Sequence, residues 1–215
     1  DVHRAQPVLG EIAERAFEHL ALLARHRAVG GHHQVHRLAE RTPLLHETQR
    51  IDELPSRIGG TYARVLLPGR IHGLAMWSPT PLPPPVVVEL PAGAMFERVC
   101  QVVDVGTFSV ANVHLSHGQL LNRRQLRWIA AMLPPRAAVL GDYNLVGPAM
   151  LRGFRDVGPR EPTHNSLDMV PLRLDRCLVR GLICVEAAAL VREASDHRPI
   201  VVRLGTAEQR LARAA

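Results

Sequence analysis

The chain has 215 residues, 47% of them hydrophobic and 4% aromatic, a composition that suits one globular domain with a sizeable core. The formal net charge is +6 and all 26 basic residues are arginine, which favours an anionic partner, although a GC-rich genome produces the same arginine bias. The absence of lysine excludes a Walker A phosphate-binding loop and Schiff-base chemistry.

Cysteine usage and hydropathy indicate the compartment. Cys100, Cys177 and Cys184 contain no CxxC pair, so they predict free thiols in a reducing environment, and we expect a cytoplasmic protein. No apolar run approaches the roughly eighteen residues that a membrane span needs. We therefore expect no membrane-spanning segment.

Residues 1–41 predict a helical N-terminal segment of unclear role. Apolar residues recur at helical spacing among charges over 10–28, Gly30-Gly31 ends that pattern, and 32–41 is a second short helical candidate. His32, His33 and His36 lie in this second segment, and the spacing places His32 and His36 on one face, where imidazoles suit a transition metal such as zinc or nickel. A polar, histidine-rich helix surface is the favoured interpretation, because no Cys or Asp lies nearby to complete a site.

The next part of the chain predicts several strands. Residues 42–48 (TPLLHET) form an apolar strand that ends in a carboxylate, and 73–82 (GLAMWSPTPL) form a strand led by glycine. A proline-rich loop and a β-branched strand follow. Residues 95–105 and 107–116 then alternate well enough to pair as an antiparallel hairpin across Gly106.

Residues 122–134 predict a helix with two different faces. Leu126, Ile129, Ala130, Met132 and Leu133 are expected to point inward, and Trp128 is also assigned to the core. Arg123, Arg124 and Arg127 lie largely on the other face. A solvated arginine face is the favoured interpretation there, with a nucleic-acid-binding patch as the alternative.

Polar residues leave the end of a core strand at 137–144 (AAVLGDYN). Ala137–Leu140 is a short apolar run without polar alternation, which is typical of a strand buried on both faces. Asp142 and Asn144 follow, and two residues apart on an extended chain their side chains point the same way. This spacing aims an acceptor and a donor at one reacting group. A short helix is expected at 147–154, and a polar loop of the kind that lines a site at 161–172.

The C-terminal part carries two further acidic motifs. Asp175 lies within the predicted strand 172–179 (LRLDRCLV), where an aspartate is disfavoured unless it has a partner. Ser195-Asp196-His197 precedes the last strand, at 199–204. A helical tail is expected at 206–215.

Three motifs of this chain resemble, in order, the C-terminal motifs of the endonuclease/exonuclease/phosphatase superfamily, which has the deoxyribonuclease I and exonuclease III fold. They are GDYN at 141–144, LDRCLV at 174–179 and SDHRPIVV at 195–202. The resemblance implies an α+β fold, a two-layered β-sandwich flanked by helices, in a domain spanning residues 42–205. The helical N-terminus is atypical for that fold.

The same resemblance implies a set of site residues. Glu47 stands where the family has its principal metal ligand, with Asp196 assisting, and Asp175 would accept a hydrogen bond from His197. His114 would face the phosphate, next to Asn112 in the family's Asn/Thr-His-Leu step, and Arg98 stands where relatives carry an acidic-Arg pair.

The implied activity is the hydrolysis of a phosphodiester, with nucleic acid slightly favoured over other phosphoesters. Mg²⁺ is the expected cofactor, with Mn²⁺ as an alternative, because a hard cation needs only one or two carboxylates. Asp142 would activate the attacking water, Asn144 would donate to a non-bridging oxygen, and His197 would stabilise the pentacovalent phosphorus.

One departure from the family keeps alternatives open. The family's first strand carries an Asn, and this chain has no Asn before Asn112. Either that strand lies outside this chain, or the N-terminal region is remodelled, or Glu47 is misassigned. The alternative function is therefore a catalytically degenerate module of the same fold that binds nucleic acid or another anion. A histidine-rich metal-binding protein that uses His32, His33 and His36 is the third hypothesis.

Overall fold

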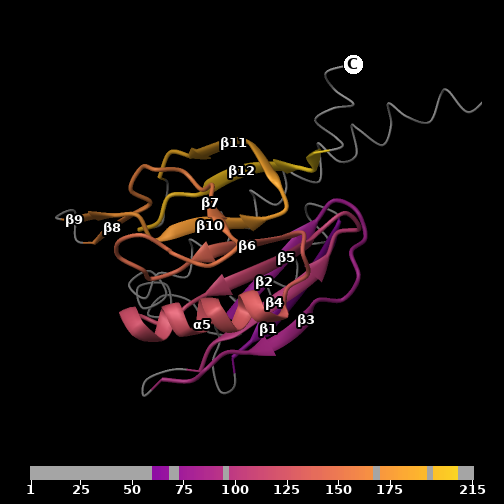
Figure 1. The fold of residues 1–215 in the computed structure, drawn as a ribbon, viewed down its shortest axis with the longest axis horizontal. Helices are drawn as coiled ribbons and strands as arrows, with labels where there is room; N and C mark the ends of the chain where they lie inside the picture. The colour runs from indigo at the N-terminus through magenta and orange to yellow at the C-terminus, as the bar shows by residue number, and fades with distance from the viewer. Residues whose placement is uncertain (1–59, 68–72, 94–96, 167–169, 193–195, 208–215) are drawn as a thin grey trace, which may run out of the picture.

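The computed structural model describes residues 60–67, 73–93, 97–166, 170–192 and 196–207. This part of the chain is mostly β-structure (Figure 1), which agrees with the β-rich architecture expected from the sequence. The predicted helices within 1–41, the candidate ligands His32, His33 and His36, Glu47 and most of the predicted C-terminal tail lie outside these residues.

A sheet of six strands forms the centre of the fold, in the order β3-β4-β5-β6-β10-β7. These strands are β3 (Val86–Glu89), β4 (Val99–Asp104), β5 (Ser109–His114), β6 (Ala137–Asp142), β7 (Arg155–Asp156) and β10 (Asp175–Arg180). The predicted hairpin across Gly106 is confirmed as β4 and β5, which pair antiparallel. β5 and β6 are parallel, so the chain must cross over between them, and α5 (Gln119–Met132) makes that connection.

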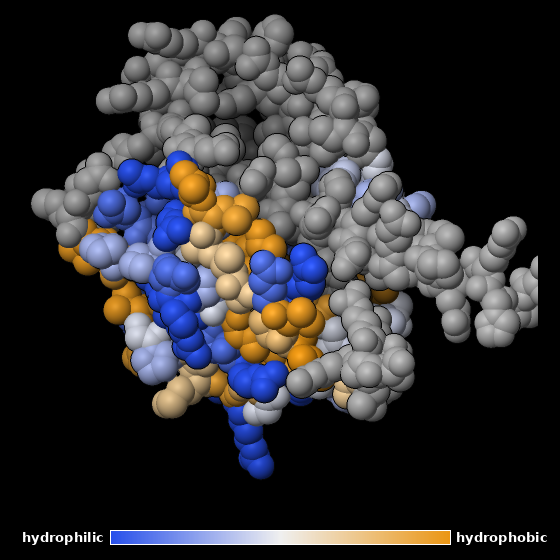
Figure 2. Space-filling view, turned by 90° about the horizontal axis from the view of Figure 1, so that it is seen from above, coloured by the Kyte–Doolittle hydropathy of each residue, from blue (hydrophilic) through white to orange (hydrophobic). Residues whose placement is uncertain are grey.

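Three two-stranded sheets accompany the central one. They pair β1 (Thr61–Leu66) with β2 (Gly73–Ser78), β8 (His164–Ser166) with β9 (Val170–Leu172), and β11 (Ile183–Ala189) with β12 (Ile200–Gly205). β2 lies against β4 and β5, and β12 lies against β10. The face on the side of β11 carries a band of apolar residues between hydrophilic ones (Figure 2).

Alternating residues of β6 build two cores on the two faces of the central sheet. Ala137 and Val139 pack with Leu126 and Ile129 of α5. Ala138 faces the other way, into a core that includes Trp77 of β2. The predicted buried strand at 137–140 is therefore confirmed, and the sheet is covered on both faces.

Two expectations about helices were wrong. Trp128 and Met132 are 52% and 44% exposed, because they fall on the outer side of α5 while Leu126, Ile129 and Leu133 are buried. Residues 147–154 form no helix. Gly147 and Gly153 adopt positive φ angles of 80° and 79° there, a conformation that a right-handed helix does not accommodate.

Candidate active site

The pairing of β5, β6 and β10 brings three predicted site residues into one row. His114 lies opposite Asp142 in the parallel ladder, and Asp142 lies opposite Asp175 in the antiparallel ladder. Directly opposed residues point to the same face of a sheet, so all three side chains leave the same edge together. Nε2 of His114 is 3.5 Å from Oδ2 of Asp142.

His197 joins this row through Asp175. Nδ1–H of His197 donates to Oδ2 of Asp175 at 2.6 Å, so the aspartate has the partner that the sequence required. Burial alone would lower the pKa of His197, but the hydrogen bond and charge of Asp175, with Asp142 and Asp196 nearby, raise it to about 9. His197 is therefore an imidazolium at neutral pH, and its Nδ1 is fixed by Asp175.

The turn after β6 holds Asp142 and Asn144 in place. Asn144 has a φ of 47°, a left-handed conformation that asparagine tolerates, and its backbone N–H donates to Oδ1 of Asp142 at 2.8 Å. Nδ2 of Asn144 donates to the Leu115 carbonyl at 2.9 Å. The Asn144 carbonyl accepts from Gln119 and Asn122 of α5. These bonds fix the turn between the end of β5 and the start of the helix.

Arg98 and Asn112 are the two remaining predicted site residues among those described. Arg98, just before β4, is buried; burial lowers its pKa, and the charge of Asp142 acts in the opposite direction. Asn112 lies two residues before His114, and its Nδ2 donates to the Ala75 carbonyl at 3.0 Å and to Oε1 of Gln101 at 3.1 Å. Asn112 thus joins β5 to β2 and β4.

His164 is a neighbour of the site that the sequence analysis did not single out. Its ring lies 4.4 Å from the His197 ring, and its Nδ1 is 3.8 Å from Oδ2 of Asp196. The pKa of His164 is lowered by burial and by the charge of His197. The expected polar loop at 161–172 was the only sequence signal, because the contact is between segments some thirty residues apart in the chain.

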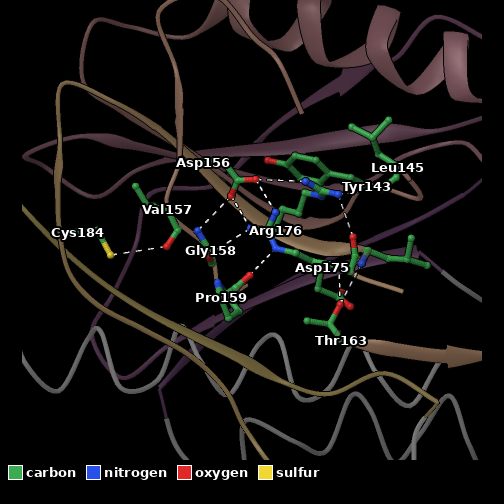
Figure 3. A network of polar contacts seen from close by, with 12 residues as sticks. Tyr143, Leu145, Asp156, Val157, Gly158, Pro159, Thr163, Asp175, Arg176 and Cys184 are labelled. Carbon is green, nitrogen blue, oxygen red and sulfur yellow. Dashed lines mark hydrogen bonds and ion pairs between the residues drawn. The ribbon is translucent and has the colours of Figure 1, made fainter. Parts of the chain in front are cut away.

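A part-buried network around Asp156 includes Arg176, the residue that follows Asp175 on β10 (Figure 3). Arg173 binds Asp156 through two N–H groups at 2.7 Å each, and Arg176 donates to the same carboxylate at 3.2 Å. Arg176 also donates to the carbonyls of Leu145 and Gly147. Since Arg176 follows Asp175 on β10, it ties that strand to the chain that continues from Asn144. Sequence reasoning did not find this network.

The three cysteines of the chain all lie in the part that the structure describes. Cys100, Cys177 and Cys184 form no disulfide with one another, and burial raises the pKa of the Cys177 thiol. Among the residues that the structure describes, no helix has both the length and the apolar composition needed to cross a membrane.

Solved structures with the same fold come from several organisms. The endonuclease/exonuclease/phosphatase from Bacteroides vulgatus superimposes with a TM-score of 0.60 at 16% identity, covering 74% of this chain and 81% of its own. A functionally unknown conserved protein from Enterococcus faecalis gives 0.58 at 18% identity, covering 74% and 82%. Humanized D. rerio TDP2 gives 0.59 at 16% identity, with the same coverage of 74% and 82%.

At these identities the structural matches establish the fold alone. No curated protein sequence matches the chain. The model of one family, described as the Endonuclease/Exonuclease/phosphatase family, matches residues 13–197. Its members are metal-dependent phosphoesterases, both nucleases and phosphatases. The chain therefore belongs to the endonuclease/exonuclease/phosphatase family.

Proposed function

We propose that this protein hydrolyses a phosphodiester, nucleic acid being the favoured substrate, by in-line attack of an activated water. The observation that carries the proposal is the row formed by His114, Asp142 and the Asp175–His197 pair at one edge of the central sheet. A fixed carboxylate beside a fixed imidazolium supplies a base and a cation within one site, as hydrolysis of a phosphoester requires.

Asp142 is the proposed base in this reaction. Its Oδ1 is held by the Asn144 backbone N–H, and its Oδ2 faces His114, so the carboxylate has a defined direction. One N–H of the Asn144 amide is committed to the Leu115 carbonyl, and the other is the one we assign to a non-bridging phosphate oxygen. Asp142 would accept the proton of the attacking water while Asn144 orients the phosphate.

His197 is the proposed cation opposite the developing charge. Because Asp175 holds Nδ1, Nε2–H is the proton that can point to the phosphate. His197 would stabilise the pentacovalent phosphorus and give a proton to the leaving oxygen. We assign two side chains to phosphate binding: His114, which contacts Asp142, and Arg98, which is buried just before β4.

The donor set fits a hard divalent cation, Mg²⁺ with Mn²⁺ as the alternative. The Asp196 carboxylate is 46% exposed beside the site and offers oxygen atoms of the type that Mg²⁺ prefers. Asp196 would hold the ion together with Glu47. When bound, the ion neutralises the charge of the non-bridging oxygens.

The proposed substrate and location rest on charge and on thiols. A net charge of +6 favours a polyanion, and Arg124 and Arg127 are exposed on α5. The three free thiols favour the cytoplasm.

The test is hydrolysis of bis(p-nitrophenyl) phosphate and of a labelled duplex, with Mg²⁺ or Mn²⁺ and then with EDTA. We expect metal-dependent cleavage that Asp142→Asn lowers at least about a hundredfold, since proton transfer by a positioned group is worth about 10²–10⁴-fold. Asp104→Asn, an exposed aspartate at the far end of β4, is the matched control. An Asp142→Asn protein with undiminished turnover would contradict the mechanism.

One sequence observation favours the alternative, a degenerate module that binds anions without hydrolysing them. The chain has no Asn before Asn112, whereas the resemblance implied one in the first strand. Duplex binding that persists in EDTA and in His197→Ala, without cleavage of either substrate, would select this alternative.

A further inference from the structure

His164, Asp196 and His197 form a compact group, here called the His–Asp–His cluster. One ligand atom from each side chain lies within 4.8 Å of the other two. The two imidazole planes are inclined by 44°, so the rings are tilted and not stacked in parallel. No step of the proposed hydrolysis uses His164.

The backbone holds the two histidines beside each other. His164 and His197 form an isolated antiparallel bridge, and the Arg198 N–H donates to the Thr163 carbonyl at 2.6 Å. The Asn165 N–H donates to the Asp196 carbonyl at 3.2 Å. Thr163 (Figure 3) accepts through Oγ1 from the Asp175 N–H at 2.9 Å, which fixes the same loop to β10. The cluster is therefore built on backbone that is already in place.

The ring nitrogens are arranged for coordination. Asp175 accepts the hydrogen bond from Nδ1–H of His197, which leaves Nε2 as the ligand atom, and a carboxylate behind a histidine strengthens that histidine as a metal ligand. Nδ1 of His164 is buried and makes no hydrogen bond with the described residues. A buried polar atom in that condition is costly, and a bound cation would remove the cost.

The donor types select the metal. Two imidazole nitrogens and one carboxylate oxygen suit Zn²⁺ and similar transition metals, whereas Mg²⁺ prefers oxygen atoms alone. Metal–ligand bonds of about 2.0–2.1 Å in a tetrahedral site place the ligand atoms about 3.3 Å apart. The ligand atoms now lie within 4.8 Å of one another, so side chains must move slightly to reach this spacing, and Asp196 can move most readily because its side chain is 46% exposed.

We propose that the His–Asp–His cluster is a transition-metal site distinct in chemistry from the magnesium site, and that Zn²⁺ bound there inhibits hydrolysis. Zn²⁺ on Nε2 of His197 would release the Nε2 proton to solvent, so His197 would have no proton to give to the leaving oxygen. It also draws Asp196 away from Mg²⁺. The inhibition rests on the proposed function, whereas the binding of the metal does not.

The test measures binding of Zn²⁺ to the full chain by calorimetry in excess Mg²⁺. His32, His33 and His36 are replaced by Ala in every sample, so that they do not contribute. We expect one tight site, weakened at least about tenfold by His164→Gln because one of three protein ligands is lost. The control is His117→Gln, an exposed histidine before α5, which should bind Zn²⁺ with unchanged affinity.

A second measurement does not depend on any substitution at His164. Co²⁺ in the same background should give the intense visible absorption of a tetrahedral ion, and Zn²⁺ should abolish it. Equal Zn²⁺ affinity with and without His164, or Co²⁺ that shows only the weak octahedral spectrum, would overturn the proposal.

Activity separates this inference from the proposed function. Inhibition by Zn²⁺, expressed relative to the Mg²⁺-dependent rate of each variant, should need at least about tenfold more Zn²⁺ in His164→Gln. Tight Zn²⁺ binding in a protein that hydrolyses nothing would support the site and contradict the proposed function. Hydrolysis by a protein whose Zn²⁺ affinity is unchanged in His164→Gln would support the proposed function and contradict the metal site.

Discussion

Asp175 orients the proposed catalytic cation, so its charge should matter more than its size. Asp175→Asn keeps the shape of the side chain but removes the charge that, with the hydrogen bond, raises the pKa of His197. We expect kcat to fall by about 10²-fold or more, because the orientation and the charge of the imidazolium are both weakened. KM should change much less.

The measurement is steady-state hydrolysis of bis(p-nitrophenyl) phosphate in Mg²⁺, with thermal unfolding checked in parallel. Asp104→Asn, which loses the same charge far from the site, should keep the wild-type kcat. A fall in both variants would point to a general effect of charge and against a specific role of Asp175.

Among the elements, α5 is fixed to the end of β10 by Arg180. The Arg180 guanidinium donates to the carbonyls of Leu133 and Pro134 at the C-terminus of the helix, and it lies 4.6 Å from the centre of the Phe154 ring. A cation at this end of a helix satisfies carbonyls and interacts favourably with the helix dipole. We expect Arg180→Ala to lower the free energy of unfolding by about 1–2 kcal/mol.

Urea unfolding monitored by circular dichroism checks this value. Arg124→Ala on the exposed face of the same helix should change the free energy by no more than about 0.5 kcal/mol. An Arg180→Ala protein as stable as this control would show that the interaction does not secure the helix.

The pair of Asp156 and Arg173, which joins β7 to the segment before β10, should make stability depend on pH. Burial alone would raise the pKa of Asp156, but the hydrogen bond and charge of Arg173, with those of Arg176, lower it below its ordinary value of 3.8. A lowered folded pKa contributes stability that is complete above the ordinary pKa and is lost as the pH falls through the folded value.

Asp156→Asn should therefore cost about 3 kcal/mol at pH 7, because it leaves the buried Arg176 and the part-buried Arg173 without their counter-ion. The difference in unfolding free energy between Asp156→Asn and the wild type should narrow as urea titrations are moved from pH 7 to about pH 3. A difference that stays constant with pH would mean that the lost contacts, and not the charge, determine the cost.

The elements with a repeating local signal were predictable from the sequence. The apolar run of β6 and the alternation of β4 and β5 follow from burial, so the strands and their hairpin were found. The outward position of Trp128 was missed, because the polar residues Asn122 and Gln125 join Leu126 and Ile129 on the buried face of α5. The size of an apolar side chain does not by itself show whether it lies on the side of a helix that packs against a sheet.

The site residues that lie at the ends of strands, or in short motifs beside them, could be predicted from the sequence. Asp142, Asp175 and His197 follow from motifs whose spacing is local, and the structure brings them together. His164 and Asp156 were missed for a different reason. Their partners lie far along the chain, and neither residue stands in a pattern that distinguishes it from an ordinary polar loop or strand end.

For the whole molecule, the excess positive charge makes a prediction about salt. If nucleic acid is the substrate, arginines bind phosphates by releasing counter-ions, and the logarithm of the affinity falls linearly with the logarithm of the salt concentration. We expect Arg124→Gln with Arg127→Gln to reduce that slope by up to about 2, since each phosphate contact contributes about 0.9.

Fluorescence anisotropy of a labelled duplex, in Ca²⁺ or EDTA to prevent cleavage, provides the measurement. Arg152→Gln with Arg160→Gln, two exposed arginines outside α5, is the matched control. An unchanged slope in the α5 variant would support the solvated-face interpretation of that helix.

The two tryptophans sit in opposite surroundings, and this gives the protein a built-in optical readout. Trp77 is 2% exposed in the core between β2 and the central sheet, whereas Trp128 is 52% exposed on α5. A quencher in solution should therefore reach Trp128 alone while the fold is intact, and both residues once the layers separate. Trp128 also stands among the arginines proposed to meet a polyanion, so a duplex bound there should shield it and leave the Trp77 emission unchanged. Folding can thus be followed by the fluorescence of Trp77 and binding by the fluorescence of Trp128, in one unlabelled sample.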